Sequence, residues 1–268
     1  MICQLTQRTL LKLTGTEVQS FLQGQFSNDI NTLKEGVVQL NAYCQHQGKI
    51  IALVWVMKKE ADFYLSFPSD LAEIVVKRLT MFKMMSDVVI TDVSDEITQL
   101  GLLESDGQNL SPFKLNDQQS IALVDSVEGI KLSDISAWEQ ACIENNLPEV
   151  YAQTSEQFVP QLLNLDIGEV GVSFTKGCYP GQEVVARLHY LGKSKRRMRA
   201  FECVQDLQVG DKLFALGSSS AKASGVVVRC VKLEHKSLCL ATIEVAHEDG
   251  EITLNDAQGA KLIRINYD

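Results

Sequence analysis

The sequence has few prolines, few aromatic residues and no long apolar run. Five prolines and 7% aromatic residues occur among its 268 residues. The longest apolar run, residues 50–57, has eight residues, whereas a membrane-spanning helix needs about 20. We therefore expect no membrane partner and interpret this run as a buried strand. Residues 1–5 also lack the basic region and apolar core of a signal peptide, so we expect a cytoplasmic protein.

Positive charge is also scarce. The chain carries 25 Lys and Arg against 34 Asp and Glu, which gives a net charge of −9 and a pI of about 5.0. Such a chain has no broad electrostatic attraction for nucleic acid or anionic membranes. Residues 187–199, with six basic residues and no acidic one, are the exception. This basic cluster predicts a local site for phosphate, a polyglutamate tail or RNA; the alternative is a solvated connector between two parts of the chain.

The cysteines lack the spacing of a disulfide framework or a metal site. They are odd in number, include no C-x-x-C pair, and occupy positions 3, 44, 142, 178, 203, 230 and 239. This pattern is typical of free thiols in a reducing compartment. Because an iron–sulfur cluster usually needs four cysteine ligands, we expect no metal site and no stable cluster in this chain alone.

One segment concentrates chemically useful residues. Residues 176–183 read Lys-Gly-Cys-Tyr-Pro-Gly-Gln-Glu. Gly177 permits a sharp bend or a close approach to a ligand, and Pro180 suits the first turn of a helix. Cys178 would then lie just before a helix N-terminus, where the helix dipole and the nearby Lys176 favour a thiolate. The alternative is that Cys178 is a buried cysteine that packs as a small apolar residue.

This octet resembles the Lys-Gly-Cys-Tyr-x-Gly-Gln-Glu signature of the YgfZ family of folate-binding proteins. Residues 171–174 and 185–187 around it, and residues 21–25 and 28–29 near the start of the chain, are also similar to that family. The family is linked to tRNA modification and to the upkeep of iron–sulfur enzymes. It is related in fold to the T-protein (aminomethyltransferase) of the glycine cleavage system.

The resemblance implies an α+β fold with a C-terminal β-barrel, arranged around an opening where the pterin enters. We expect an aminomethyltransferase-like, folate-binding region over residues 1–195, with 1–92 and 93–195 as candidate subdomains. The barrel is expected over 196–268, where six short strand-like segments alternate with turns. Residues 9–92 independently predict a β-α-β-β-β-α-β order and a helix-backed, mostly antiparallel sheet.

Local signals predict how the helices begin. Thr14 to Glu17 has the spacing of a capping box. Ser69 or Asp70 is expected to cap a second helix, and Asp134 a third that runs to residue 146.

The resemblance also implies site residues. It assigns a functional thiol to Cys178 and folate contacts to Trp138, Lys176, Tyr179, Arg187 and Arg8. The indole of Trp138 is suited to stacking on a flat pterin, with simple core packing as the alternative. Arg8 stands where some relatives carry an aromatic residue, and it is suited to stacking on the pterin or pairing with a carboxylate of the folate tail.

A departure from the aminomethyltransferases limits the expected chemistry. Those enzymes place acidic residues directly after the segment that resembles Gly48 to Ile51, but here residues 52–54 are Ala-Leu-Val. Without a carboxylate this segment neither moves a proton nor binds the pterin amine. We therefore expect a protein that binds tetrahydrofolate or another folate, polyglutamylated forms included, and supports iron–sulfur enzymes such as those that modify tRNA.

Two alternatives stay open. One is a tetrahydrofolate-dependent one-carbon (aminomethyl or methyl) transferase or demethylase, with Cys178 as nucleophile or base. The other is direct binding of tRNA through the basic cluster, which salt-dependent binding would reveal.

Overall fold

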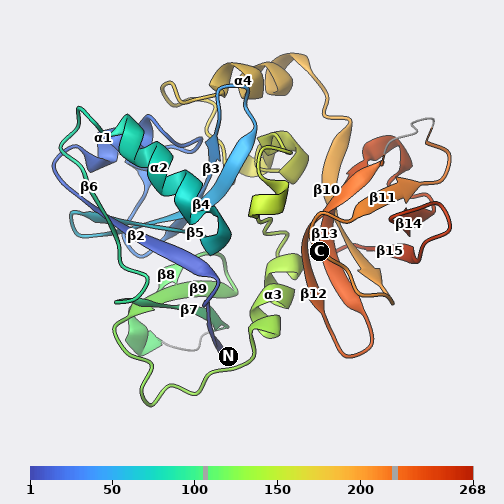
Figure 1. The fold of residues 1–268 in the computed structure, drawn as a ribbon, viewed down its shortest axis with the longest axis horizontal. Helices are drawn as coiled ribbons and strands as arrows, with labels where there is room; N and C mark the ends of the chain where they lie inside the picture. Colours follow the sequence, from blue (N-terminus) through green and yellow to red (C-terminus); the bar gives the residue numbers. More distant parts are fainter. Residues whose placement is uncertain (105–107, 219–222, 268) are drawn as a thin grey trace.

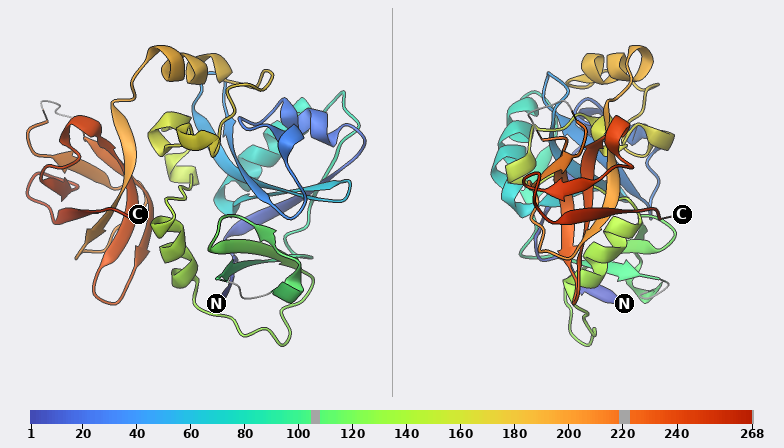
Figure 2. Two further views of the ribbon diagram at one scale, coloured as in Figure 1. Left: turned by 180° about the vertical axis from the view of Figure 1, so that it is seen from behind. Right: turned by 90° about the vertical axis from the view of Figure 1, so that its right-hand side faces the viewer.

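The computed structural model describes residues 1–104, 108–218 and 223–267. Two sheets with their helices lie on one side and a barrel on the other (Figure 1). Helix α3 (Ile135–Glu144) and short 3-10 turns fill the space between them, and α4 (Gln182–Leu191) passes over the top toward the barrel (Figures 1 and 2). The 3-10 turns in this space are η4 (Ala152–Thr154), η5 (Pro160–Leu163) and η6 (Ile167–Glu169). The others lie with the sheets or on the barrel and are η1 (Ile30–Thr32), η2 (Ser69–Leu71), η3 (Gln108–Leu110) and η7 (Val245–His247).

Five antiparallel strands form the first sheet, in the order β3-β4-β5-β2-β6. They are β2 (Arg8–Thr14), β3 (Val38–Cys44), β4 (Ile50–Lys59), β5 (Asp62–Pro68) and β6 (Val89–Asp92). Helices α1 (Val18–Gln23) and α2 (Ala72–Phe82) cover one face, where Phe21 and Val75 share a core with Val54. The expected element order is confirmed, and every residue of the apolar run 50–57 is buried in β4 because both faces of the sheet are covered.

The second sheet has four strands in the order β1-β7-β9-β8. They are β1 (Ile2–Gln4), β7 (Thr98–Leu103), β8 (Phe113–Lys114) and β9 (Gln119–Val124). Helix α3 contacts both this sheet and the barrel. Asp134 caps α3 as expected, since its carboxylate accepts a hydrogen bond from the Ser136 N–H, and the helix ends at Glu144, two residues earlier than expected.

Six antiparallel strands close into a barrel in the order β10-β13-β12-β11-β14-β15. They are β10 (Arg196–Cys203), β11 (Lys212–Ala215), β12 (Gly225–Lys232), β13 (Ser237–Glu244), β14 (Ile252–Leu254) and β15 (Lys261–Ile265). Phe201, Leu213 and Ile243 are part of its apolar core. The expected C-terminal barrel is confirmed. In the described parts of the chain, no helix is long and apolar enough to cross a bilayer.

Two of the expected helix caps are wrong. Helix α1 has Glu17 as its N-cap residue without a side-chain cap, because Glu17 instead accepts a hydrogen bond from the Asp87 N–H. At the second helix, Pro68 precedes η2 without a side-chain cap, and the Asp70 carboxylate accepts from the Ala152 N–H. In both places a tertiary partner competes successfully with the local cap.

Candidate functional site

The loop that precedes α4 presents one thiol to solvent. Cys178 is exposed, whereas the other cysteines are buried or partly buried. Its loop leads into α4, which has Gly181 as N-cap residue and begins at Gln182. The expectation of a cysteine shortly before a helix therefore agrees with the backbone, and Cys178 is not packed in the core.

Lys176 has a role that the sequence did not suggest. Its side chain is buried, with 8% of the residue exposed. The ammonium donates hydrogen bonds to the carbonyl oxygens of Gln23, Phe26 and Asn28, at 2.6, 2.5 and 2.9 Å. All three of its N–H donors are thus used within the protein rather than for a folate. Burial lowers the pKa of Lys176 to about 8, against the weaker raising effect of Asp29.

The loop is fixed again at its other end. Tyr179 is buried, and burial raises the pKa of its hydroxyl group. Gly181 has a φ of 82°, and a Cβ there would lie 2.5 Å from the Gln45 carbonyl oxygen and 2.6 Å from the Gly48 Cα. The signature glycine is therefore required both for its left-handed backbone and for close contact with the β3–β4 turn.

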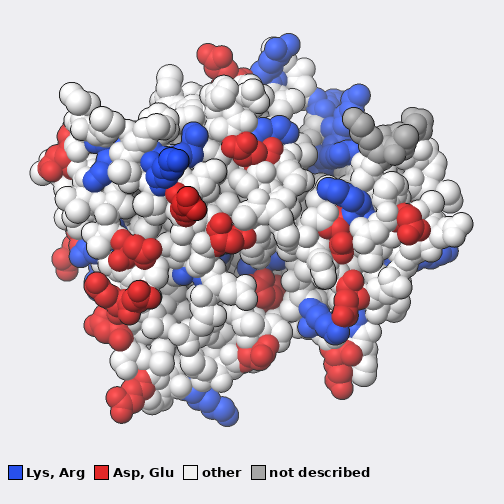
Figure 3. All heavy atoms as spheres, viewed as in Figure 1, with Lys and Arg blue, Asp and Glu red and all other residues white. Residues whose placement is uncertain are grey.

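Half of the six basic residues of the basic cluster pair with acidic residues in the fold. Arg187 is exposed on α4. Three arginines of β10 pair with acidic residues: Arg196 with Glu244 at 3.1 Å, Arg197 with Asp166 at 2.5 Å, and Arg199 with Glu248 at 2.8 Å. Figure 3 shows acidic and basic side chains interspersed on the face it presents. These three arginines thus lie in a barrel strand with acidic partners, and not in the solvated connector that the sequence suggested as the alternative.

Trp138 and Arg8 both pack against Trp55, and each already has partners within the protein. The Trp138 indole is 1% exposed and meets Trp55 edge to face, with centroids 6.2 Å apart. Gly101 packs on the indole so tightly that a Cβ would lie 2.4 Å from its Cε3 atom. In this conformation the indole is a core residue without a face open to a pterin.

Arg8 is held just as firmly. Its guanidinium lies 3.5 Å from the Trp55 ring centroid, pairs with the Glu149 carboxylate and donates to the Ser66 hydroxyl at 2.8 Å. Arg8 and Trp138 line a cavity of about 30 Å³, which is room for about one water molecule. The ring and the carboxylate that contact the Arg8 guanidinium, those of Trp55 and Glu149, are therefore parts of the protein itself.

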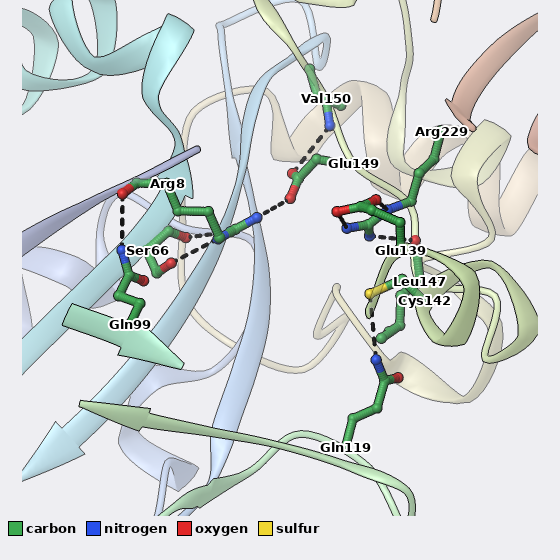
Figure 4. Close-up of polar contacts among 10 residues, drawn as sticks. All are labelled: Arg8, Ser66, Gln99, Gln119, Glu139, Cys142, Leu147, Glu149, Val150 and Arg229. Carbon is green, nitrogen blue, oxygen red and sulfur yellow. Dashed lines mark hydrogen bonds and ion pairs between the residues drawn. The ribbon is translucent and has the colours of Figure 1, made fainter. Parts of the chain in front are cut away.

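A second buried ion pair was missed from the sequence. Arg229 on β12 donates to both carboxylate oxygens of Glu139 on α3, at 2.7 and 3.2 Å, and to the Leu147 carbonyl at 3.1 Å (Figure 4). The only sequence signal is a charged residue inside the apolar segment Gly225–Lys232.

A more spacious site than the cavity beside Arg8 is a groove formed by two neighbouring cavities of about 240 and 360 Å³, which share lining residues. Both are lined by Leu40, Leu147 and Val170. The larger one is also lined by amide and aromatic side chains, and these are Asn145, Asn146, Asn164, Asn266 and Tyr267. We call this pair of cavities the asparagine groove. Its combined size and its mixture of apolar and amide groups are typical of small-molecule sites.

One residue lining the asparagine groove has a side-chain oxygen without a partner. Asn164 has a left-handed backbone, with φ 60°, and its Nδ2 donates to the Met198 carbonyl oxygen at 2.9 Å. Its Oδ1 is buried without a hydrogen-bond partner among the described residues. The Nδ2 contact fixes the orientation of the amide and leaves this buried oxygen unsatisfied.

The asparagine groove is connected to the signature loop through one residue. The Asn28 amide donates to the carbonyl oxygens of Leu40 and Val170, at 3.1 and 3.3 Å. The Asn28 carbonyl oxygen in turn accepts from Lys176. Neither Arg8, Trp138 nor Cys178 lines either cavity of the groove. Sequence patterns missed the groove because its lining comes from six separate segments.

The described residues include no cluster of three or more His, Cys, Asp and Glu side chains that could hold a metal ion.

Comparisons with known proteins identify relatives of this chain and a solved structure with a similar fold. No protein-family model matches the chain. A Haemophilus influenzae relative, named only as an uncharacterized protein, is 30% identical over 237 residues, which cover 86% of this chain and 84% of the relative. The tRNA-modifying protein YgfZ of Hamiltonella defensa is 29% identical, with 87% of this chain and 80% of the relative covered.

The YgfZ protein of Colwellia psychrerythraea is 28% identical, with 74% of this chain and 70% of the relative covered. Among solved structures, the glycine cleavage aminomethyltransferase T of Bartonella henselae matches with a TM-score of 0.72. The match covers 99% of this chain and 84% of that chain at 12% sequence identity. The aminomethyltransferase-like fold is thus established.

Proposed function

This chain belongs to the YgfZ family, and on that premise we propose that it binds a reduced folate in the asparagine groove and supports tRNA modification. The observation that carries the proposal is the asparagine groove itself, which has the size of a small-molecule site, is lined by apolar and amide side chains, and is connected to the signature loop through Asn28. Its expected place of action is the cytoplasm.

The residues of the groove fit a folate. A pterin is flat and apolar on its faces, and its edge carries an amino group and a ring N–H. Leu40, Leu147 and Met198 supply apolar surface, and the asparagine side chains of the lining supply amide oxygens as acceptors for the edge donors. Lys34 lines the smaller cavity, so the anionic glutamate tail is expected to extend toward it. When bound, tetrahydrofolate supplies the chemistry of a one-carbon carrier.

Cys178 supports the second half of the proposal. Its exposure makes the thiol available to another protein, and the rest of its loop is fixed by Lys176, Tyr179 and Gly181. We assign Cys178 to thiol exchange or transient contact with iron–sulfur enzymes, including those that modify tRNA.

The one-carbon transferase alternative is disfavoured. Ala52, Leu53 and Val54 occupy the position of the acidic residues of aminomethyltransferases, and each is 0% exposed inside β4. No carboxylate is supplied there for proton transfer.

Calorimetric titration of the whole chain with tetrahydrofolate under reducing conditions tests the groove. Val170→Trp narrows it at a residue shared by both cavities, and we expect binding to weaken more than about tenfold. Asn164→Gly keeps the left-handed backbone and removes an amide side chain from the lining of the groove, so a loss of about fivefold to tenfold is expected.

Val89→Trp is the matched control, since Val89 and Val170 are both 54% exposed and Val89 lies on β6. It should bind as the wild type does. Absence of binding by the wild type, or equal affinity of Val170→Trp and Val89→Trp, would contradict the proposal.

A further inference from the structure

In the signature loop, the exposed thiol of Cys178 lies between two buried residues, Lys176 and Tyr179, which we call the anchors. Gly177 and Cys178 are exposed, whereas the residues on either side, Lys176 and Tyr179, are buried. The two anchors contact each other beneath the exposed pair, with the Lys176 Nζ 5.3 Å from the Tyr179 ring centroid. The position of Cys178 therefore depends on how firmly both anchors are held.

The carbonyl groups that hold Lys176 come from a distant part of the chain. They belong to the last residue of α1, Gln23, and to Phe26 and Asn28 in the turn that follows it. Gln23 and Asn28 belong to the other residues that resemble the family, 21–25 and 28–29, and Phe26 lies between these two stretches. Two motifs about 150 residues apart in the sequence are thus joined by one side chain.

Only a lysine matches this arrangement. An ammonium group points three N–H donors away from one atom, and the three carbonyl oxygens surround that atom. Arginine spreads its donors over a planar fork, and methionine has no donor. The charged group that acts on Lys176 is Asp29, whose Oδ1 also accepts from Gln23 Nε2 and the Asn31 N–H, at 3.0 Å each. Among the described residues, the ammonium contacts backbone carbonyl groups and the Tyr179 ring and has no direct carboxylate partner.

We propose that Lys176 is a positioning residue, which joins the signature loop to the turn after α1 and thereby fixes the Cys178 thiol for its partner. The biological meaning of this inference rests on the proposed role of Cys178. Its physical content does not, because it concerns the free protein.

Hydrogen exchange of the ligand-free protein tests whether Lys176 joins the signature loop to the turn after α1. In Lys176→Met, backbone amides of residues 173–181 and 24–28 should both lose protection, by about tenfold. Lys193→Met is the control, because Lys193 is exposed at the end of α4, and it should exchange as the wild type does. A second measurement is the rate at which Cys178 reacts with a small maleimide. This rate should change several-fold in Lys176→Met and stay unchanged in Lys193→Met.

Chemical rescue separates positioning from general damage. In Lys176→Ala, added propylammonium should restore protection and the wild-type thiol rate, because it returns three N–H donors to the carbonyl groups. Tetramethylammonium carries the charge without an N–H donor and should not. If Lys176→Met fails to fold, the rescue of Lys176→Ala decides the question on its own.

Two results would overturn the inference: unchanged exchange and thiol rate in both variants, or equal rescue by the two cations. Folate affinity plays no part in these measurements. Absence of folate binding would therefore not contradict the positioning role of Lys176. Absence of the positioning effect would likewise not contradict folate binding.

Discussion

The guanidinium of Arg229, on the barrel, donates two hydrogen bonds to the Glu139 carboxylate of α3. The Arg229 side chain is 2% exposed and that of Glu139 is 24% exposed. Removing one partner from such a pair leaves the other charge desolvated and unpaired. We expect Arg229→Met to lower the free energy of unfolding by about 3 kcal/mol, as measured by urea denaturation.

Lys232→Met provides the comparison on the same strand. Its pair with Asp206 is exposed on both sides, at 69% and 68%, so the loss should be below about 0.5 kcal/mol. Equal effects of the two substitutions would contradict a buried link between α3 and the barrel.

Gly101 controls how Trp138 packs. A methyl group at residue 101 would lie 2.4 Å from the indole, in a site that cannot expand without moving α3. Gly101→Ala should therefore destabilise the protein by about 2–3 kcal/mol. Gly24→Ala, where the nearest atom would be 3.5 Å away, should be nearly neutral. Thermal unfolding of both variants checks this, and a neutral Gly101→Ala would mean that the indole is mobile enough to accept a ligand.

Much of the fold followed from local patterns, because strands with continuous or alternating apolar residues have few other ways to bury them. The run 50–57 and the six short barrel strands were predicted for this reason. The caps expected at Thr14 to Glu17 and at Ser69 or Asp70 were wrong, since the side chains of Glu17 and Asp70 bond to residues far along the chain. Sequence patterns carry no signal for such partners.

The candidate site was likewise predictable only in part. The exposed cysteine before a helix was predictable from Gly177, Pro180 and the helical composition after them. The burial of Lys176 was not, because its three acceptors are backbone oxygens, which any sequence offers. The asparagine groove was also unpredictable, since Asn146 and Asn164 become neighbours only when α3 and η5 are packed.

Stability should depend on the titration of Lys176. Burial lowers the pKa of its ammonium to about 8 in the folded protein, from the usual 10.5. Between these two values the unfolded chain holds a proton that the folded chain has lost, so the contribution of this group to stability rises with pH. The contribution is lowest below pH 8 and complete above 10.5.

Lys176→Met removes this titration. The difference in unfolding free energy between wild type and Lys176→Met should therefore shift in favour of the wild type when urea denaturation at pH 7.5 is compared with pH 10. A constant difference, or a shift in favour of the variant, would show that burial does not depress the pKa.

Replacing Cys178 by serine tests the central claim most directly, with folate affinity and tRNA modification in cells measured on the same variant. We predict that Cys178→Ser binds tetrahydrofolate as the wild type does, because the side chain does not line the asparagine groove, and that tRNA modification falls to the level of cells lacking the protein. Full tRNA modification by Cys178→Ser would contradict the account.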